Sequence, residues 1–234
     1  MNKKEITYKT LRWGPCVIHY QVSEEFRNIL LDEADKSNPS YGHRLAGHLE
    51  KEVKLDSSKC KKHFDEMFHI YDHALSNWIQ KKVGIRYILS DLWCNFQKAN
   101  EFNPPHDHGG ALSFVIYLQV PKEIKEECLK HQEIKTSAGP GSISFMCGDT
   151  SKKFSLTQNS LFPEVGDCFV FPAFLEHWVY PFKSDVTRIS VSGNIVDSLD
   201  LKYMSDKGIT NAVEDIERDK KWVNLLKQTV HMFI

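Results

Sequence analysis

Two histidines at alternating positions are the residues of this sequence best suited to hold a metal ion. His106 and His108 lie in the segment NPPHDHGG, directly before a strongly β-forming run. In an extended chain alternate side chains project to the same side, so both imidazoles can point together while Asp107 points away. Two such imidazoles form part of a chelate for a transition metal. Taken alone, the pair is also compatible with a polar loop between two strands.

A third histidine and an arginine, much later in the chain, strengthen the metal hypothesis. His177 is flanked by aromatic residues in GDCFVFPAFLEHWVYPF, and Arg188 begins the run RISVSGN that follows. A lone histidine on an aromatic strand is more often a core residue than a ligand. Beside a metal, however, a fixed arginine suits an anionic chelating co-substrate, because guanidinium binds a carboxylate through two hydrogen bonds. Ser190 shares the strand face of Arg188 and can donate its hydroxyl to the same carboxylate.

The elements that must position these residues are short strands. Between Tyr87 and Ile195 the sequence consists of β-branched and aromatic runs separated by Gly, Pro, Asn and Asp. Many short strands at this spacing predict a sandwich or a barrel. The runs are YILSDLWCNFQ, ALSFVIYLQV, SISFMC, DCFVFPAF, HWVYPF and RISVSGNIV. In the first of them Trp93, Asn95 and Gln97 alternate on one face, which would place Asn95 in a pocket.

Helices are expected on either side of this β-rich region. An extended piece at 16–22 precedes a helix capped by Ser23, whose hydroxyl can accept from a free first-turn amide. A longer amphipathic helix is predicted from Ser57 or Ser58 to about Lys82, ended by Val83-Gly84. Its histidines, His69 and His73, are expected on the surface. A last helix is predicted near the C-terminus, where Asn211 and Glu214 form a capping box.

Composition excludes several function classes and leaves others open. The 234 residues carry a formal net charge of −1, which disfavours a nucleic-acid substrate. No apolar run reaches the roughly 18 residues that a membrane span requires. The six cysteines are dispersed, without a CxxC pair or a secretory signal, which predicts reduced thiols and a cytoplasmic protein. Oligomeric state cannot be read from the sequence.

At this point the sequence resembles the 2-oxoglutarate and Fe(II)-dependent oxygenases, and more narrowly the prolyl-hydroxylase-like oxygenases of bacteria and their phages. The resemblance rests on NPPHDHGGALSFVIYL, GDCFVFPAFLEHWVYPF and RISVSGN. It implies a mainly β fold with flanking helices, whose core is a double-stranded β-helix, a jelly-roll or cupin-like barrel. We expect a single domain over 1–234, with N-terminal elements in 1–85, the oxygenase core in 86–197 and a helical extension in 198–234.

The resemblance also implies a role for individual residues. The proximal and distal metal-binding histidines of the family motif match His106 and His177. The arginine that binds the far carboxylate of 2-oxoglutarate matches Arg188, with Ser190 as the hydroxyl of the R-x-S motif. Tyr117 resembles a tyrosine that often contacts the same carboxylate. We assign Asn95 to the same pocket.

One position departs from the family pattern. The family usually has a carboxylate two residues after the proximal histidine, and this chain has His108 there. Asp107 is one residue too early for a regular strand, although an irregular backbone at Gly109-Gly110 could bring it inward. The second ligand is therefore His108 or Asp107, with His108 preferred.

The implied activity is that of a dioxygenase. Fe(II), 2-oxoglutarate and O2 are the implied cofactor and co-substrates, and decarboxylation to succinate is coupled to hydroxylation of a small-molecule or peptide substrate, with a prolyl peptide preferred. One alternative is a three-histidine Fe(II) dioxygenase that uses no keto acid, in which Arg188 holds the substrate's own carboxylate. Another is a non-catalytic cupin-like binding protein.

Overall fold

The computed structural model describes residues 14–36, 38–82, 84–135, 137–148 and 157–197. Its helices are α1 (Glu24–Ala34), α2 (Lys61–Ile79) and α3 (Lys122–Ile134), with short 3₁₀ turns at Gly42–Arg44 and Ser58–Cys60. Its strands are β1 (Ile18–Gln21), β2 (Lys51–Lys54), β3 (Tyr87–Gln97), β4 (Asn103–His106), β5 (Leu112–Gln119), β6 (Ile143–Met146), β7 (Gln158–Leu161), β8 (Asp167–Pro172), β9 (Glu176–Val179) and β10 (Arg188–Asp197). The mainly β fold with helices agrees with the sequence-based expectation.

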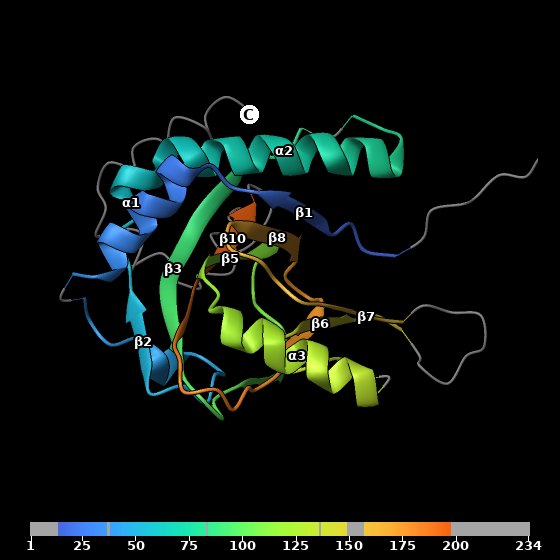
Figure 1. Ribbon diagram of the computed structural model, residues 1–234. Helices are drawn as coiled ribbons and strands as arrows, with labels where there is room; N and C mark the ends of the chain where they lie inside the picture. Colours follow the sequence, from blue (N-terminus) through green and yellow to red (C-terminus); the bar gives the residue numbers. More distant parts are fainter. Residues whose placement is uncertain (1–13, 37, 83, 136, 149–156, 198–234) are drawn as a thin grey trace, which may run out of the picture.

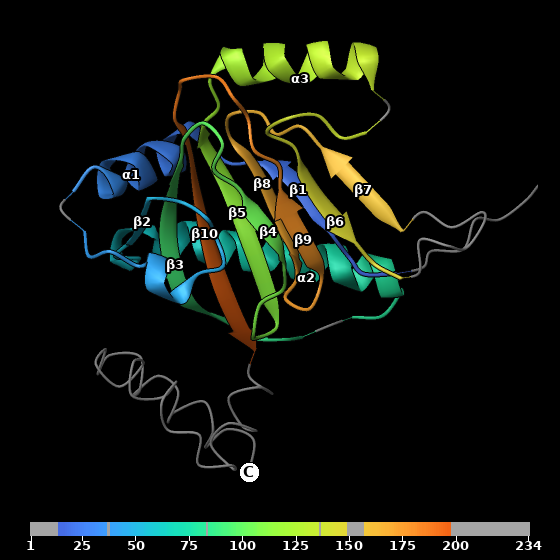
Figure 2. The ribbon, with the colours of Figure 1, turned by 90° about the horizontal axis from the view of Figure 1, so that it is seen from below.

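The strands form two antiparallel sheets. The large sheet has the order β1-β8-β5-β10-β3-β2, and the small sheet has the order β4-β9-β6-β7. Figures 1 and 2 show the two sheets stacked as layers, with α1 and α2 on the outer side of the large sheet and α3 on the opposite side of the molecule. The sheets are hydrogen-bonded separately, so the expected barrel is a two-sheet jelly roll and not a continuous closed barrel.

The large sheet is buried on both faces, which explains its nearly continuous apolar runs. One set of alternate residues, including Cys94, Phe114 and Ile116, packs against Phe64 and Met67 of α2. The other set points between the sheets, where aromatic and aliphatic side chains form a second cluster. Its buried members are Val115, Tyr117, Ile143, Phe145, Phe169, Phe171, Leu175 and Val179. This second layer surrounds the candidate site.

The two N-terminal helices form where the sequence predicts them. Ser23 caps α1, accepting a hydrogen bond of 3.2 Å from the amide of Phe26. The end of α2 differs from the prediction: the helix stops at Ile79, because Gln80 adopts a left-handed conformation with φ 55° and bonds back to Ser76. Val83-Gly84 is therefore not the stop signal. His69 and His73 are exposed, as expected.

Four elements were not predicted from the sequence. The segment KEIKEECLKHQEI was included in the β-rich region, yet it forms α3, burying only Ile124 and Cys128 on one stripe. The strands β2, β4 and β7 are four residues each, too short for periodicity to reveal. Asn103-Pro104-Pro105, expected to be a turn, lies in β4. Proline is tolerated there because β4 is an edge strand.

The N-terminal segment is built into the core. β1 pairs with β8, and β2 pairs with β3, so residues before 86 supply both edges of the large sheet. The expected boundaries 1–85, 86–197 and 198–234 stay predictions, and the helix expected at 211–233 lies outside the described residues. None of the described helices has the length and apolar character to cross a bilayer.

The centre of the large sheet leaves no room for a side chain at Gly193. A Cβ built there would lie 2.6 Å from the carbonyl oxygen of Asp91 and 2.6 Å from the ring of Phe114. We expect Gly193→Ala to lower the free energy of unfolding by about 1–3 kcal/mol through overpacking, measured by urea denaturation. Gly84→Ala is the control, because its Cβ would meet nothing within 4 Å. Equal stability of the two variants would contradict this account.

Candidate metal centre and co-substrate pocket

Two of the three candidate ligands are opposite neighbours on the small sheet. His106 ends β4 and His177 lies in β9, and the antiparallel register pairs these two residues directly. Their ring centroids are 4.3 Å apart. His177 is buried and packs edge-on against Phe171 at 4.7 Å. The pairing of β4 with β9 therefore brings together histidines that lie far apart in the sequence.

The third histidine reaches the site from the loop that follows β4. His108 lies beyond the end of the strand, and its amide donates to the carbonyl of Ala173 at 2.9 Å. The amide of Ala173 in turn donates to the carbonyl of Ala111 at 3.0 Å. These two bonds hold the loop against the turn between β8 and β9. Asp107 is exposed, whereas His108 joins His106 and His177.

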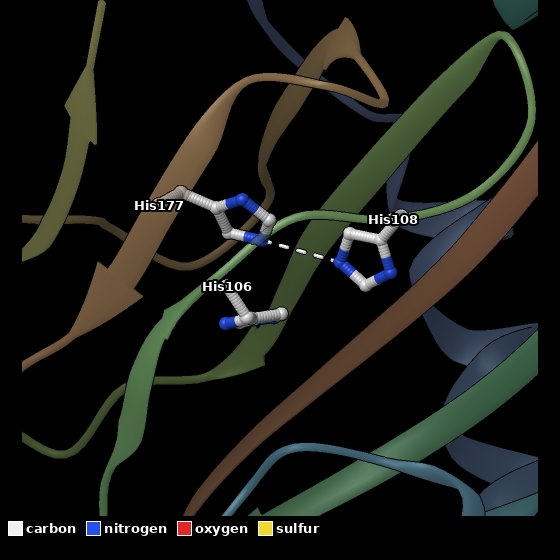
Figure 3. A group of neighbouring side chains, drawn as sticks. All are labelled: His106, His108 and His177. Atoms are coloured by element: carbon white, nitrogen blue, oxygen red, sulfur yellow. Dashed lines mark hydrogen bonds between the residues drawn. The ribbon is translucent and has the colours of Figure 1, made fainter.

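The three imidazoles have a geometry that fits one metal ion. Their nitrogen atoms all lie within 4.8 Å of one another, and the Nε2 atoms of His108 and His177 are 3.3 Å apart. Ligands at about 2.1 Å from a metal, with angles of about 90–110° between them, lie about 3.0–3.4 Å apart. Figure 3 shows the three side chains gathered around a shared space between the ribbons.

Hydrogen bonds and burial prepare these histidines for metal binding. Nδ1 of His106 donates to the carbonyl of Pro104 at 2.7 Å, and Nδ1 of His177 donates to that of Leu175 at 2.9 Å. A proton fixed on Nδ1 leaves the Nε2 lone pair free for a metal. Burial, together with His106, lowers the pKa of His108 to about 4 and that of His177 to about 3. Both rings are therefore neutral at pH 7, as ligands must be.

A buried guanidinium lies in the same pocket as the histidines. Arg188 is 2% exposed, donates from Nη1 to the carbonyl of Gly141 at 2.6 Å, and donates from Nη2 to Oε1 of Gln97. Its Nε has no hydrogen-bond partner among the described residues. Burial lowers the pKa of Arg188, and no carboxylate of the described chain offsets that penalty. A buried cation without a counter-ion is costly, which indicates that an anionic ligand completes this site.

Tyr117 and Ser190 lie beside this guanidinium. The centroid of the Tyr117 ring lies 5.3 Å from the Arg188 guanidinium carbon, and no described residue forms a hydrogen bond with the buried Tyr117 hydroxyl. Ser190 is paired with Tyr117 on one side and with Asn95 on the other, and all three line the pocket. The Asn95 amide donates to the Ser192 hydroxyl at 3.3 Å. The Arg188 Nε and the Tyr117 hydroxyl are thus two unused donors, suited to a carboxylate.

Sequence reasoning missed the role of Gln97 in this pocket and did not indicate Glu52 at all. Gln97 orients Arg188 by accepting its hydrogen bond, and its own amide donates to the carbonyl of Glu101 at 2.5 Å. The alternation of side chains placed Gln97 on the same strand face as Asn95, but it gave no sign that Gln97 orients Arg188. Glu52 of β2 lines the pocket from the sheet edge, and no sequence motif marks it. Trp93, for which core packing and a pocket role were both open, lines the pocket 5.9 Å from the His108 ring.

Comparison with known proteins relates this region of the chain to a family of oxygenases. Residues 91–194 match a family described as "Putative 2OG-Fe(II) oxygenase". This part of the chain is similar to that oxygenase family. The resemblance noted in the sequence is thereby confirmed, as is the class of enzyme, an oxidoreductase, with iron and 2-oxoglutarate as the family's cofactor and co-substrate. No curated protein matched the chain.

Solved structures show the same fold. A prolyl-4-hydroxylase from Pseudomonas putida matches with a TM-score of 0.51 and 13% identity, over 76% of this chain and 90% of that one. A 2OG-Fe(II) oxygenase family protein from Burkholderia pseudomallei matches with a TM-score of 0.48 and 10% identity, over 77% of this chain and 85% of that one. The viral collagen prolyl hydroxylase of Paramecium Bursaria Chlorella virus-1 matches with a TM-score of 0.45 and 13% identity, over 76% of this chain and 94% of that one. The double-stranded β-helix expected from the sequence is therefore confirmed.

Proposed function

We propose that this oxygenase hydroxylates a small-molecule or peptide substrate, with Fe(II) held by His106, His108 and His177. The proposal depends most on Arg188, a buried guanidinium that shares a pocket with the three histidines and has no acidic partner among the described residues. The far carboxylate of 2-oxoglutarate would supply that partner, with the Tyr117 hydroxyl as a further donor. Ser190 and Asn95 complete the polar lining.

Each group of the pocket has a defined task in this proposal. Bound iron(II), with 2-oxoglutarate and O2, supplies the oxidising chemistry, in which the co-substrate leaves as succinate and CO2 and one oxygen atom enters the substrate. The histidines fix the position of the metal, and their Nδ1–H bonds hold the rings in place. Arg188 orients the co-substrate, and Gln97 orients Arg188. Ile143, Phe171 and Val179 line the same space and exclude water.

The ligand set raises a question about charge. Three neutral imidazoles leave iron(II) with its full +2 charge, whereas the usual two-histidine, one-carboxylate set lowers it. His108 is the better candidate for the second ligand, because Asp107 is exposed while His108 lies with the other two histidines.

We also propose 86–197 as the oxygenase core, with 1–85 and 198–234 as its extensions.

Succinate formation is the decisive measurement. The purified chain, given Fe(II), 2-oxoglutarate and O2, is expected to release succinate, first without substrate and then faster with prolyl peptides as the initial panel. Prolyl substrates come first because the P. putida enzyme of the same fold is a prolyl-4-hydroxylase. O2 consumption without succinate would instead indicate a dioxygenase that uses no keto acid. Absence of affinity for Fe(II), Co(II) and Mn(II) would indicate a binding protein.

A further inference from the structure

One carboxyl group in the pocket has no place in the proposed mechanism. Glu52 lies on β2, the edge strand of the large sheet, and lines the same pocket as the histidines and Arg188. This residue is 3% exposed, and its Oε2 has no hydrogen-bond partner within the part of the chain that the structure describes. A buried acid without a partner is as unusual as a buried unpaired cation, so Glu52 requires its own explanation.

The sheet register places Glu52 at the far end of a polar row from the co-substrate site. Glu52 pairs with Asn95, Asn95 with Ser190, and Ser190 with Tyr117, so the four residues run straight across β2, β3, β10 and β5. With about 4.8 Å between neighbouring strands, Glu52 lies about 14 Å along the sheet from Tyr117. The four C–C bonds of 2-oxoglutarate, about 1.5 Å each, span no more than about 6 Å. A co-substrate anchored at Arg188 therefore leaves the Glu52 end for the primary substrate.

The surroundings of Glu52 remove water without supplying a cation. The 3₁₀ turn Gly42–Arg44 and the segment after it lie directly on the carboxyl: a Cβ at Gly47 would be 2.8 Å from Oε1, and one at Gly42 would be 3.0 Å from Oε2. Leu45 and Leu49 of this segment also line the pocket. Burial and, to a smaller extent, the nearby carboxylate of Glu101 together raise the pKa of Glu52 to about 7. The pKa of Glu52 is thus shifted by burial and by another acid, and by no basic group among the described residues, which makes this end of the pocket favourable for a positive charge.

We propose that Glu52 is the substrate-specificity residue of this oxygenase, and that its carboxylate binds an ammonium or guanidinium group of the primary substrate. This inference rests on the proposed function, because it takes the Arg188 end of the pocket as the 2-oxoglutarate site. The substrate is then a peptide or small molecule with a cationic nitrogen. The pairing is energetically strong, because both charges are removed from water at a site where Oε2 of the acid has no hydrogen-bond partner among the described residues.

The test compares matched probes on the holoprotein. Wild type is loaded anaerobically with Fe(II) and 2-oxoglutarate, and the dissociation constants of Nα-acetyl-lysinamide and Nα-acetyl-argininamide are measured by calorimetry. The amides of Nα-acetyl-norleucine and Nα-acetyl-citrulline are the uncharged counterparts. We expect the cationic probes to bind at least about tenfold more tightly, and Glu52→Gln to abolish that preference. Glu50→Gln is the control, since Glu50 is exposed on the same sheet edge and pairs with Lys98.

Two readouts separate this inference from the proposed function. The visible charge-transfer band of the Fe(II)–2-oxoglutarate chelate should form equally in wild type, Glu52→Gln and Glu50→Gln. Its absence from wild type would overturn the proposed function and this inference with it. If the band forms, equal affinity of wild type for charged and uncharged probes would overturn the role of Glu52 alone. A preference that persists in Glu52→Gln would do the same.

Discussion

His177→Ala is expected to lose iron(II) binding and, with it, all 2-oxoglutarate turnover. His177 contributes a neutral Nε2 that lies 3.3 Å from the Nε2 of His108, and no other described His, Cys, Asp or Glu joins these two and His106. Changing a residue that only supports a ligand typically costs about 10–100-fold in metal affinity. Removing the ligand itself should therefore cost about 100-fold or more. Calorimetry with Fe(II) under anaerobic conditions measures the loss, and succinate release measures the activity.

Two controls make that result specific. His73→Ala removes an exposed imidazole from α2 and should leave metal affinity and activity unchanged. Asp107→Ala should also retain iron, because Asp107 is exposed and is not part of the three-histidine group, whereas His108→Ala should behave like His177→Ala. If His177→Ala bound Fe(II) as tightly as wild type, the metal centre would lie elsewhere. If Asp107→Ala lost iron and His108→Ala kept it, the second ligand would be the carboxylate.

Alternation in an extended chain indicated two histidines that do lie together in the fold, but for an incomplete reason. The i, i+2 rule assumes that both residues belong to one strand, but β4 ends at His106. His108 is directed inward by its amide bond to Ala173, a residue of the turn before β9. That bond depends on tertiary structure. The residue types and the spacing therefore indicated the candidate ligands, while the means of positioning them became visible only in the fold.

Other features depended on contacts that no local pattern encodes. Glu52 belongs to a four-residue edge strand, and its position opposite Asn95 follows from the pairing of β2 with β3. The helix α3 has two buried residues among thirteen, so its apolar periodicity is too weak to distinguish it from a polar connection. The long strands β3, β5 and β10 were predictable, because their continuous apolar runs reflect burial on both faces.

Arg188→Met is expected to separate co-substrate binding from metal binding. The variant keeps the three histidines, so its affinity for Fe(II) should match that of wild type. It loses a buried guanidinium whose hydrogen bonds to a carboxylate contribute about 1.5–3 kcal/mol each. A loss of about 3 kcal/mol corresponds to an increase of more than about 100-fold in the dissociation constant of 2-oxoglutarate. Anaerobic titration of the Fe(II) form with 2-oxoglutarate, followed by the charge-transfer band, measures this constant.

Arg188→Lys is the informative companion variant. Lysine keeps the positive charge but cannot reproduce the planar fork, which holds the carbonyl of Gly141 and the amide oxygen of Gln97 through Nη1 and Nη2 while Nε remains unused. Its affinity for 2-oxoglutarate should fall between those of wild type and Arg188→Met. Equal affinity in all three proteins would mean that the keto acid does not bind at Arg188. Because the buried guanidinium has no carboxylate partner within the described chain, the anion it binds would then have to be the substrate's own, as in a dioxygenase that needs no keto acid.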